Sequence, residues 1–165
     1  MKTLAMILLC LFASPGEETA ENKNFDLEKY MGRWYEVARF DHWFERGLSH
    51  VKTTYTLEDD GKVRVENSGV RPDGKIKTVI GRAKMADDGN PMHLRVSFFL
   101  WFYSDYNILD IDPEYRYVLI GSSSDSYLWI LSRTPSLPAD VKERLLNTAR
   151  ENGYDTSRLI WVEQE

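Results

Sequence analysis

Three Asp-Gly steps constrain the fold of this chain more than any other feature. They stand at Asp60-Gly61, Asp73-Gly74 and Asp88-Gly89. Asp-Gly is the preferred chemistry of a two-residue hairpin, because both central positions of that turn favour a positive φ. The residues around the three steps form runs of strand length in which apolar and polar side chains alternate. The chain is therefore predicted to be a series of antiparallel strands joined by tight turns.

Eight strand candidates follow one another along the chain. They lie at residues 33–40, 50–58, 62–70, 76–85, 92–102, 106–112, 115–121 and 127–133. The period then changes, since residues 139–152 place Val141, Leu145 and Ala149 on one stripe of a helix, and a strand-like piece follows at 157–163. A long meander satisfies both of its edges most economically by closing into an up-and-down barrel. The expected fold is all-β, an eight-stranded antiparallel barrel with one C-terminal α-helix packed outside.

The first residues indicate export from the cytoplasm. Lys2 is followed by a short apolar run and then by small residues, so residues 1–20 are predicted to be a secretory signal peptide and residues 21–165 a single domain. The competing interpretation is an apolar N-terminus on a cytosolic protein. Cys10 is the only cysteine, and two fates are open to it: acylation, as in a bacterial lipoprotein, or removal with the signal peptide.

Composition argues against several functions. The net charge is -5 and no basic stripe occurs, so nucleic acid is not an expected partner. His42, His50 and His93 are scattered without metal-ligand spacing, and no nucleophile elbow or phosphate loop is present. Neither a metal nor a cofactor is expected, and the chain is predicted not to be an enzyme. Glu36 is the one candidate acid–base residue.

Several segments together resemble the lipocalin family. The run GRWYE at 32–36 matches the Gly-x-Trp signature that opens the first strand of lipocalins, and Arg133 follows the last barrel strand as the family's late arginine does. The segments RFDHWFERGL, VSFF, YLWILSRTP and LIWV look like bacterial Blc-type members, and the apolipoprotein D group is also similar. The family's second signature, Thr-Asp-Tyr, survives only as Asp112 followed by Tyr117. The resemblance runs from about Phe25 to Gln164.

The resemblance gives the signature residues a structural role. It implies that Trp34 plugs the closed end of the barrel and that Arg133 lies across its indole face, a cation–π contact of roughly 0.5–2 kcal/mol. Gly32 then permits close approach of the N-terminal segment to this end.

Strand alternation predicts which side chains face the barrel interior. Starting from the signature residues and from the apolar alternation, the inward set is Glu36, Ala38, Thr53, Tyr55, Leu57, Val63, Val65, Arg71, Leu94, Val96, Phe98, Trp129 and Leu131. The resemblance implies ligand contacts at six positions: Tyr55, Arg71, Phe98, Asn107, Tyr117 and Trp129. Alternation agrees for four of these, while the faces of Asn107 and Tyr117 stay open because their strands are apolar on both sides.

A mostly aromatic lining with one cation suggests a ligand with an acyl chain and a charged head, such as a fatty acid or a lysophospholipid. Arg71 would pair with the head group, or it is a solvated hairpin charge. The expected function is lipid binding in the bacterial cell envelope, in the periplasm or at the outer membrane, with secretion as the alternative. Two other functions compete: a small-molecule-modifying enzyme on a lipocalin barrel, and a protein-interaction module with a filled barrel.

The segment at 40–48 is the least usual loop, since it holds Phe40, Trp43, Phe44 and Leu48 among charges. In this strand order it lies over the open end. It is either a lid, a membrane-touching rim or a homodimer contact, or a loop that folds its aromatic side chains onto the barrel rim.

Overall fold

A computed structural model describes residues 25–99 and 102–164. The predicted signal peptide and Cys10 lie outside the described residues. The described part of the chain begins with a single helical turn, α1 (Leu27–Tyr30), which is capped by the side chain of Asp26. The barrel strands follow, and their bounds are β1 (Gly32–Arg39), β2 (Ser49–Leu57), β3 (Val63–Val70), β4 (Ile76–Met85), β5 (His93–Phe99), β6 (Phe102–Ile111), β7 (Tyr117–Gly121) and β8 (Leu128–Ser132).

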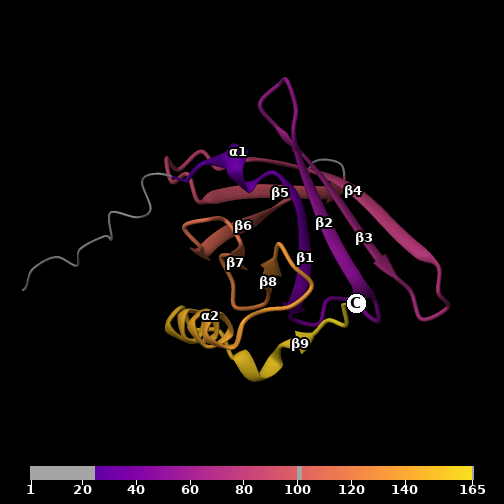
Figure 1. The fold of residues 1–165 in the computed structure, drawn as a ribbon. Coiled ribbons are helices and arrows are strands. Elements are labelled where there is room, and N and C mark those ends of the chain that lie inside the picture. Colours follow the sequence, from indigo (N-terminus) through magenta and orange to yellow (C-terminus); the bar gives the residue numbers. More distant parts are fainter. Residues whose placement is uncertain (1–24, 100–101, 165) are drawn as a thin grey trace, which may run out of the picture.

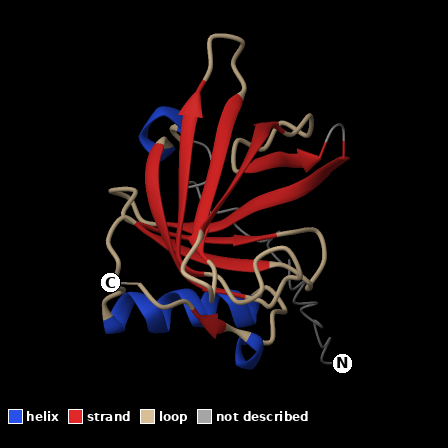
Figure 2. Cartoon of the chain, turned by 90° about the vertical axis from the view of Figure 1, so that its right-hand side faces the viewer, coloured by secondary structure: helices blue, strands red, loops and turns tan. Residues whose placement is uncertain are grey.

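The strands close into the expected barrel. Each pairs antiparallel with its neighbour in sequence, and β1 pairs with both β2 and β8. A helix, α2 (Ala139–Glu151), packs outside the wall, and a short strand, β9 (Ile160–Trp161), adds to the free edge of β1. Figures 1 and 2 show the curved sheet with α2 along its outer side. The predicted fold class is confirmed.

The two ends of the barrel differ, and we name them for use below. The floor is the end at which β1 begins, with α1 across it. The mouth is the opposite end, where the chain passes through residues 40–48, 71–75 and 122–127 and through the β5–β6 hairpin. Every second connection of an up-and-down barrel lies at the same end, so strand order alone places these four segments together.

The Asp-Gly turns form, but with different geometry from the prediction. Gly61, Gly74 and Gly89 have φ of 78°, 79° and 78°, whereas no Asp of these turns has a positive φ. Each Asp side chain instead accepts a hydrogen bond from the backbone N–H two residues on, as Asp60 does from Lys62 at 3.0 Å. These are longer turns that end in a left-handed glycine, a second common hairpin connection.

The predicted boundary between the fifth and sixth strands is wrong. The sequence predicts one strand over 92–102, but β5 ends at Phe99 and β6 begins at Phe102. Phe99 and Phe102 pair with each other, so the predicted strand is divided between two antiparallel neighbours. This turn contains no Gly, Pro, Asn or Asp, so the usual turn signals are missing.

Two apolar clusters lie on opposite sides of the barrel wall. The inner cluster fills the lower barrel and contains Tyr30, Trp34, Tyr55, Val63, Val65, Ala83, Met92, Leu94, Tyr106, Ile108, Val118, Ile120 and Leu131. The outer cluster, between the wall and α2, contains Val37, Ala38, Phe40, Leu119, Leu128, Ile130, Leu145, Ala149 and Tyr154. One sheet thus has two apolar faces, which explains why β7 and β8 read as continuous apolar runs.

A β-bulge in β1 corrects one predicted inward residue. The register against β8 shifts between Glu36 and Ala38, so both Val37 and Ala38 pack in the outer cluster. An extra residue in one strand reverses the facing of every residue after it. Ala38 therefore faces α2, and Arg39 takes the inward position in its place.

Candidate functional site

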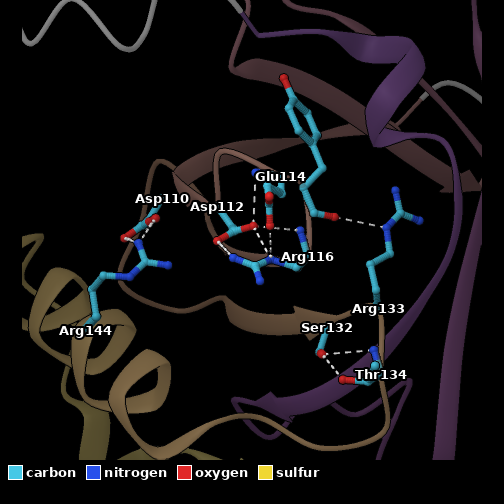
Figure 3. A network of polar contacts seen from close by, with 9 residues as sticks. Asp110, Asp112, Glu114, Arg116, Ser132, Arg133, Thr134 and Arg144 are labelled. Atoms are coloured by element: carbon cyan, nitrogen blue, oxygen red, sulfur yellow. Dashed lines mark hydrogen bonds and ion pairs between the residues drawn. The ribbon is translucent and has the colours of Figure 1, made fainter.

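The floor of the barrel is built around Trp34 and Arg133. Trp34 is fully buried, and its indole Nε1 donates to the carbonyl of Tyr30 at 2.9 Å. The Arg133 guanidinium carbon lies 3.8 Å from the centroid of the Trp34 ring, the arrangement that the resemblance implies. The Arg133 N–H groups also donate to five backbone carbonyls, those of Lys29, Tyr30, Met31, Arg33 and Tyr115. Figure 3 shows the Arg133 side chain beside the β6–β7 connection that carries Glu114 and Arg116. The arginine thus ties together the first turn, β1 and the β6–β7 connection.

Gly32 is required at this floor for two reasons. Its φ is +93°, in the left-handed region, and a Cβ there would lie 3.3 Å from Nη1 of Arg133. Any larger residue would combine backbone strain with a push on the arginine.

Three buried tyrosines line the barrel just above the floor. The Tyr106 hydroxyl lies 2.5 Å from that of Tyr30 and 2.8 Å from that of Tyr55. Burial raises the pKa of all three hydroxyls above the ordinary value of 10, so they stay protonated. They enclose a cavity of about 10 Å³ together with Met31, Val63, Ala83, Leu94 and Val96. That volume is enough for about one water molecule.

Of the six predicted ligand residues, three lie on the interior. Tyr55 belongs to the tyrosine group, and Phe98 packs against the inner cluster over Gly81, where a Cβ would meet its ring at 2.6 Å. Trp129 also contacts the inner cluster but sits higher, beside the 40–48 loop. Tyr55 and Trp129 therefore mark opposite ends of the interior.

The other three residues face away from it. Arg71 is exposed in the β3–β4 turn, beyond the end of β3. Asn107 lies between Tyr106 and Ile108, which both point inward, so alternation turns it outward. Tyr117 packs against the outer cluster. For Arg71 the solvated-hairpin interpretation describes its position, and the predicted ligand roles of Asn107 and Tyr117 do not fit theirs.

The loop at 40–48 covers the mouth, and we call it the lid. Phe40 packs in the outer cluster, and the His42 ring stacks on Phe44 with centroids 5.2 Å apart. His42 also lies 4.8 Å from the ring of Tyr127 and 4.9 Å from that of Trp129. Most of the aromatic side chains of the lid therefore fold down onto the barrel rim.

Trp43 is the exception in the lid. Its side chain is 73% exposed, although its ring edge contacts Phe44. The two interpretations of this loop thus each describe a part of it. The folded aromatics close the mouth, and Trp43 presents an apolar surface to whatever lies above it.

A group of buried charges holds the lid from below. Arg39 donates to Oε1 of Glu36 at 2.7 Å, and both side chains are almost completely buried. The same guanidinium donates to the carbonyls of Glu45 at 2.9 Å and Leu48 at 3.2 Å. Glu45, also buried, receives a hydrogen bond from the Trp129 indole at 3.2 Å. A guanidinium and two carboxyl groups thus meet inside the barrel, and we call Glu36, Arg39 and Glu45 the buried triad.

The buried triad shifts the ionisation of its members. Burial first, and then the charge of Glu45, raise the pKa of Glu36 well above its ordinary value, against the lowering effect of Arg39. Burial also raises the pKa of Glu45, although the Trp129 hydrogen bond, Arg39 and Lys77 oppose it. His42 changes in the opposite direction, because burial and Arg39 lower its pKa to about 4. The lid histidine is therefore neutral near pH 7, and the carboxyl pair retains protons more strongly than ordinary acids.

Sequence reasoning missed most of this site. Alternation found Glu36, but it turned Arg39 outward because the bulge is invisible in the residue pattern. Glu45 sat in a loop, where no periodicity assigns a face. Asn67 was also missed, although it lies on the inward face of β3 between Val65 and Gly69, and its side-chain oxygen is buried without a hydrogen-bond partner among the described residues. A charged pair three residues apart within an apolar strand was the one available signal.

Among residues 25–99 and 102–164, no three His, Cys, Asp or Glu side chains form a group that could hold a metal ion. None of the helices in the described part of the chain is long and apolar enough to cross a membrane.

Comparison with known proteins places these features in a wider group. A family model described as a lipocalin-like domain matches residues 25–164. The chain is 43% identical over 160 residues to the outer membrane lipoprotein Blc of Escherichia coli K12, which covers 96% of this chain and 90% of the relative. It is 35% identical over 150 residues to apolipoprotein D of Rattus norvegicus, and this match covers 86% of this chain and 78% of the relative.

Solved structures agree on the fold. Lobster apocrustacyanin A1 superposes with a TM-score of 0.70 at 20% identity, covering 90% of this chain and 82% of the other. Insecticyanin from the tobacco hornworm Manduca sexta gives 0.70 at 21% identity, with coverage of 86% and 82%. At these identities the match shows a shared barrel architecture.

Proposed function

The chain belongs to the lipocalin family, and we propose that it binds fatty acids or lysophospholipids inside its barrel in the bacterial cell envelope. The observation that carries the proposal is the division of the interior. Apolar side chains and three neutral tyrosines form the lower part, and buried charges lie under the lid at the upper part. An acyl chain suits the first environment and a polar head group the second.

Unused hydrogen-bonding capacity supports a polar head near the lid. Nε of Arg39 and the side-chain oxygen of Asn67 are both buried, and neither has a partner among the described residues. Buried polar atoms are normally paired, so a head group or water that bonds to them would be favoured. Arg71, at the turn outside, is not needed for this role.

The lid and the side chains beneath it must move before a lipid can enter. The enclosed cavity at the floor has a volume of about 10 Å³, whereas small-molecule pockets usually exceed about 300 Å³. Arg39 binds two carbonyls of the lid and His42 packs against Trp129, so the described structure represents the barrel with its lid closed. This small cavity also favours the second candidate, an interaction module whose barrel is filled by side chains. The enzyme alternative is weakened, because the carboxylate of Glu36 is paired with Arg39.

Location in the cell envelope rests on the relatives. Proteins named outer membrane lipoprotein match nearly the whole chain at 42% and 43% identity. The signal peptide predicted at residues 1–20 would fit such a location. For Cys10, acylation and removal both remain open, and the intact mass of the mature N-terminus separates them.

A titration tests the proposal. Adding a fluorescent fatty acid should quench tryptophan fluorescence in a saturable way at micromolar concentration, because Trp129 lies beside the proposed head-group region. Unlabelled lysophospholipid should reverse the quenching by competition. A Thr56→Ala variant, changed at an exposed position of β2, serves as the control and should bind like the original chain. Absence of saturable quenching would overturn lipid binding and favour the filled-barrel module.

A further inference from the structure

We propose that the lid is closed by a proton held between Glu36 and Glu45, so that ligand exchange through the mouth depends on pH. The proposal rests on the proposed function for its ligand, but the closure itself is a property of the buried triad. Glu36 and Arg39 belong to β1, whereas Glu45 belongs to the lid. The lid thus brings its own carboxyl group into contact with a pair that is already neutral.

Charge balance explains why a proton is needed. Arg39 carries one positive charge, and it pairs with Glu36 at 2.7 Å. When the lid closes, Glu45 adds a second carboxyl group to a region almost without solvent. An uncompensated buried charge is strongly unfavourable, so the buried triad becomes neutral by retaining one proton on the carboxyl pair. When the lid opens, Glu45 moves into water and ionises as an ordinary acid.

Neighbouring groups do not remove this requirement. Lys77 on β4 approaches the lid, and its ammonium donates at 2.5 Å to the carbonyl of Phe44. Its charge lowers the pKa of Glu45, but this effect is smaller than the increase that burial causes. Trp129 on β8 donates a neutral hydrogen bond. His42 in the lid is neutral above about pH 4, and Tyr55 on β2, protonated, adds no charge. The pKa of both carboxyl groups stays raised after all these contributions.

The sign of the pH effect follows from the closed state holding more protons than the open state. The closed lid is favoured at low pH and becomes weaker as the pH rises above the ordinary carboxyl pKa of 4.5 toward the raised values. One linked proton changes the ratio of closed to open lid by up to about tenfold for each pH unit within this window. The dissociation rate of a bound lipid should therefore increase as the pH rises.

Other contacts keep the lid positioned while the proton sets how firmly it closes. Arg39 holds the carbonyls of Glu45 and Leu48, and the tilted contact of the His42 ring with the Trp129 ring adds aromatic packing. His42, whose pKa is lowered to about 4, stays neutral over the pH range in which raised carboxyl groups lose their protons. The carboxyl pair is therefore the element of the lid that senses pH.

The experiment uses two independent signals from the full-length mature chain. The first is the NMR signal of the ¹⁵N-labelled Trp129 indole, assigned with Trp129→Phe, which reports the bond to Glu45 with no ligand present. The second is the stopped-flow displacement rate of a fluorescent fatty acid. Both are measured from about pH 4.5, the ordinary pKa of a glutamate carboxyl, up to about pH 8.5, because burial raises the pKa of Glu36 and of Glu45 above that ordinary value.

In the original chain the indole signal should shift over this range and the displacement rate should rise with pH. Glu45→Gln keeps the shape and the hydrogen-bond acceptor but adds no charge, so both signals should become independent of pH. Glu36→Gln should do the same, because Glu45 would then neutralise Arg39 without a proton. Asp41→Asn removes an exposed lid carboxylate, paired with Arg46, and should retain the original pH dependence.

The outcomes separate the two proposals. A flat indole signal in the original chain, or an unchanged pH slope in both glutamine variants, would overturn the proton-held lid. If no fatty acid binds but the indole signal titrates as expected, lipid binding fails and the closure mechanism stands.

Discussion

At the floor, a single aromatic side chain lies between the first helical turn and the late arginine. Trp34 has no exposed surface, contacts the Tyr30 ring at 5.1 Å between centroids and lies under Arg133. We expect Trp34→Ala to lower the free energy of unfolding by about 3–5 kcal/mol, the usual effect of deleting a large buried aromatic residue. Denaturant melts measure this. Tyr35→Ala, on the outward face of the same strand, should lose clearly less free energy of unfolding. Equal losses in the two variants would contradict a particular role of Trp34 in holding the floor.

Residues at strand positions were predictable where alternation is regular and not where it breaks. Tyr55 and Trp129 face inward as predicted, because β2 and β8 keep their period over these positions. Arg39 and Glu45 could not be assigned, since one follows a bulge and the other lies in a loop. The predicted ligand set therefore contained one residue at each end of the interior, Tyr55 and Trp129, and missed the charged side chains beside Trp129.

At the scale of elements, the docking of α2 depends on the absence of a side chain. A Cβ on Gly121 of β7 would collide with the Tyr154 hydroxyl and lie 2.9 Å from Leu109. That hydroxyl donates to the carbonyl of Ser122 at 3.0 Å and accepts from its N–H at 3.1 Å. The chain after α2 is thus fastened to the end of β7. On the other side of the helix, Arg144 pairs with Asp110 of β6 (Figure 3).

We expect Gly121→Ala to lower the free energy of unfolding by about 1–3 kcal/mol, because overpacking forces the tyrosine away from its two hydrogen bonds. Guanidinium titration followed by circular dichroism measures the change. Ser123→Ala, two residues on and exposed, is the matched control and should remain close to the original stability. If Gly121→Ala unfolds at the same denaturant concentration as the control, Tyr154 does not hold this corner.

The elements themselves were largely predictable, because their signals are local. The helix at 139–151 follows from its apolar stripe, and three turns follow from Asp-Gly steps. The β5–β6 hairpin was not found, since an apolar sequence without Gly or Pro turns there. The bulge in β1 was not found either, because both faces of the strand at that point are buried and its residues fit either register.

At the scale of the whole molecule, the mouth and the floor differ in their surface side chains. Exposed apolar side chains gather at the mouth, on the lid, at the start of β4 and on the β5–β6 hairpin: Trp43, Ile76, Phe99 and Phe102. The turns at the floor are acidic instead, with Glu58, Asp59, Asp60, Asp87, Asp88 and Glu114. The β3–β4 turn beside the lid has a net positive charge, because Arg71 and Lys75 outnumber Asp73. An anionic bilayer would therefore attract the mouth and repel the floor.

This asymmetry predicts membrane contact through the mouth. We expect Trp43→Ser with Phe102→Ser to weaken binding to vesicles that contain an anionic phospholipid by about tenfold or more, since each buried aromatic contributes on the order of 1.5–3 kcal/mol. Vesicle co-sedimentation measures the loss. Leu57→Ser is the control, because Leu57 is also exposed but lies at the floor end. Salt should weaken the binding of the original chain, as its electrostatic part is screened.

The same surface could instead form a homodimer, and experiments can distinguish a homodimer from membrane contact. A mouth-to-mouth dimer would hide Trp43 and Phe102 from lipid, so vesicle binding would fall as protein concentration rises, and the double serine variant would sediment as a monomer. Membrane contact predicts that binding per molecule is independent of protein concentration. Equal loss in Leu57→Ser would contradict both, because neither interaction uses the acidic floor.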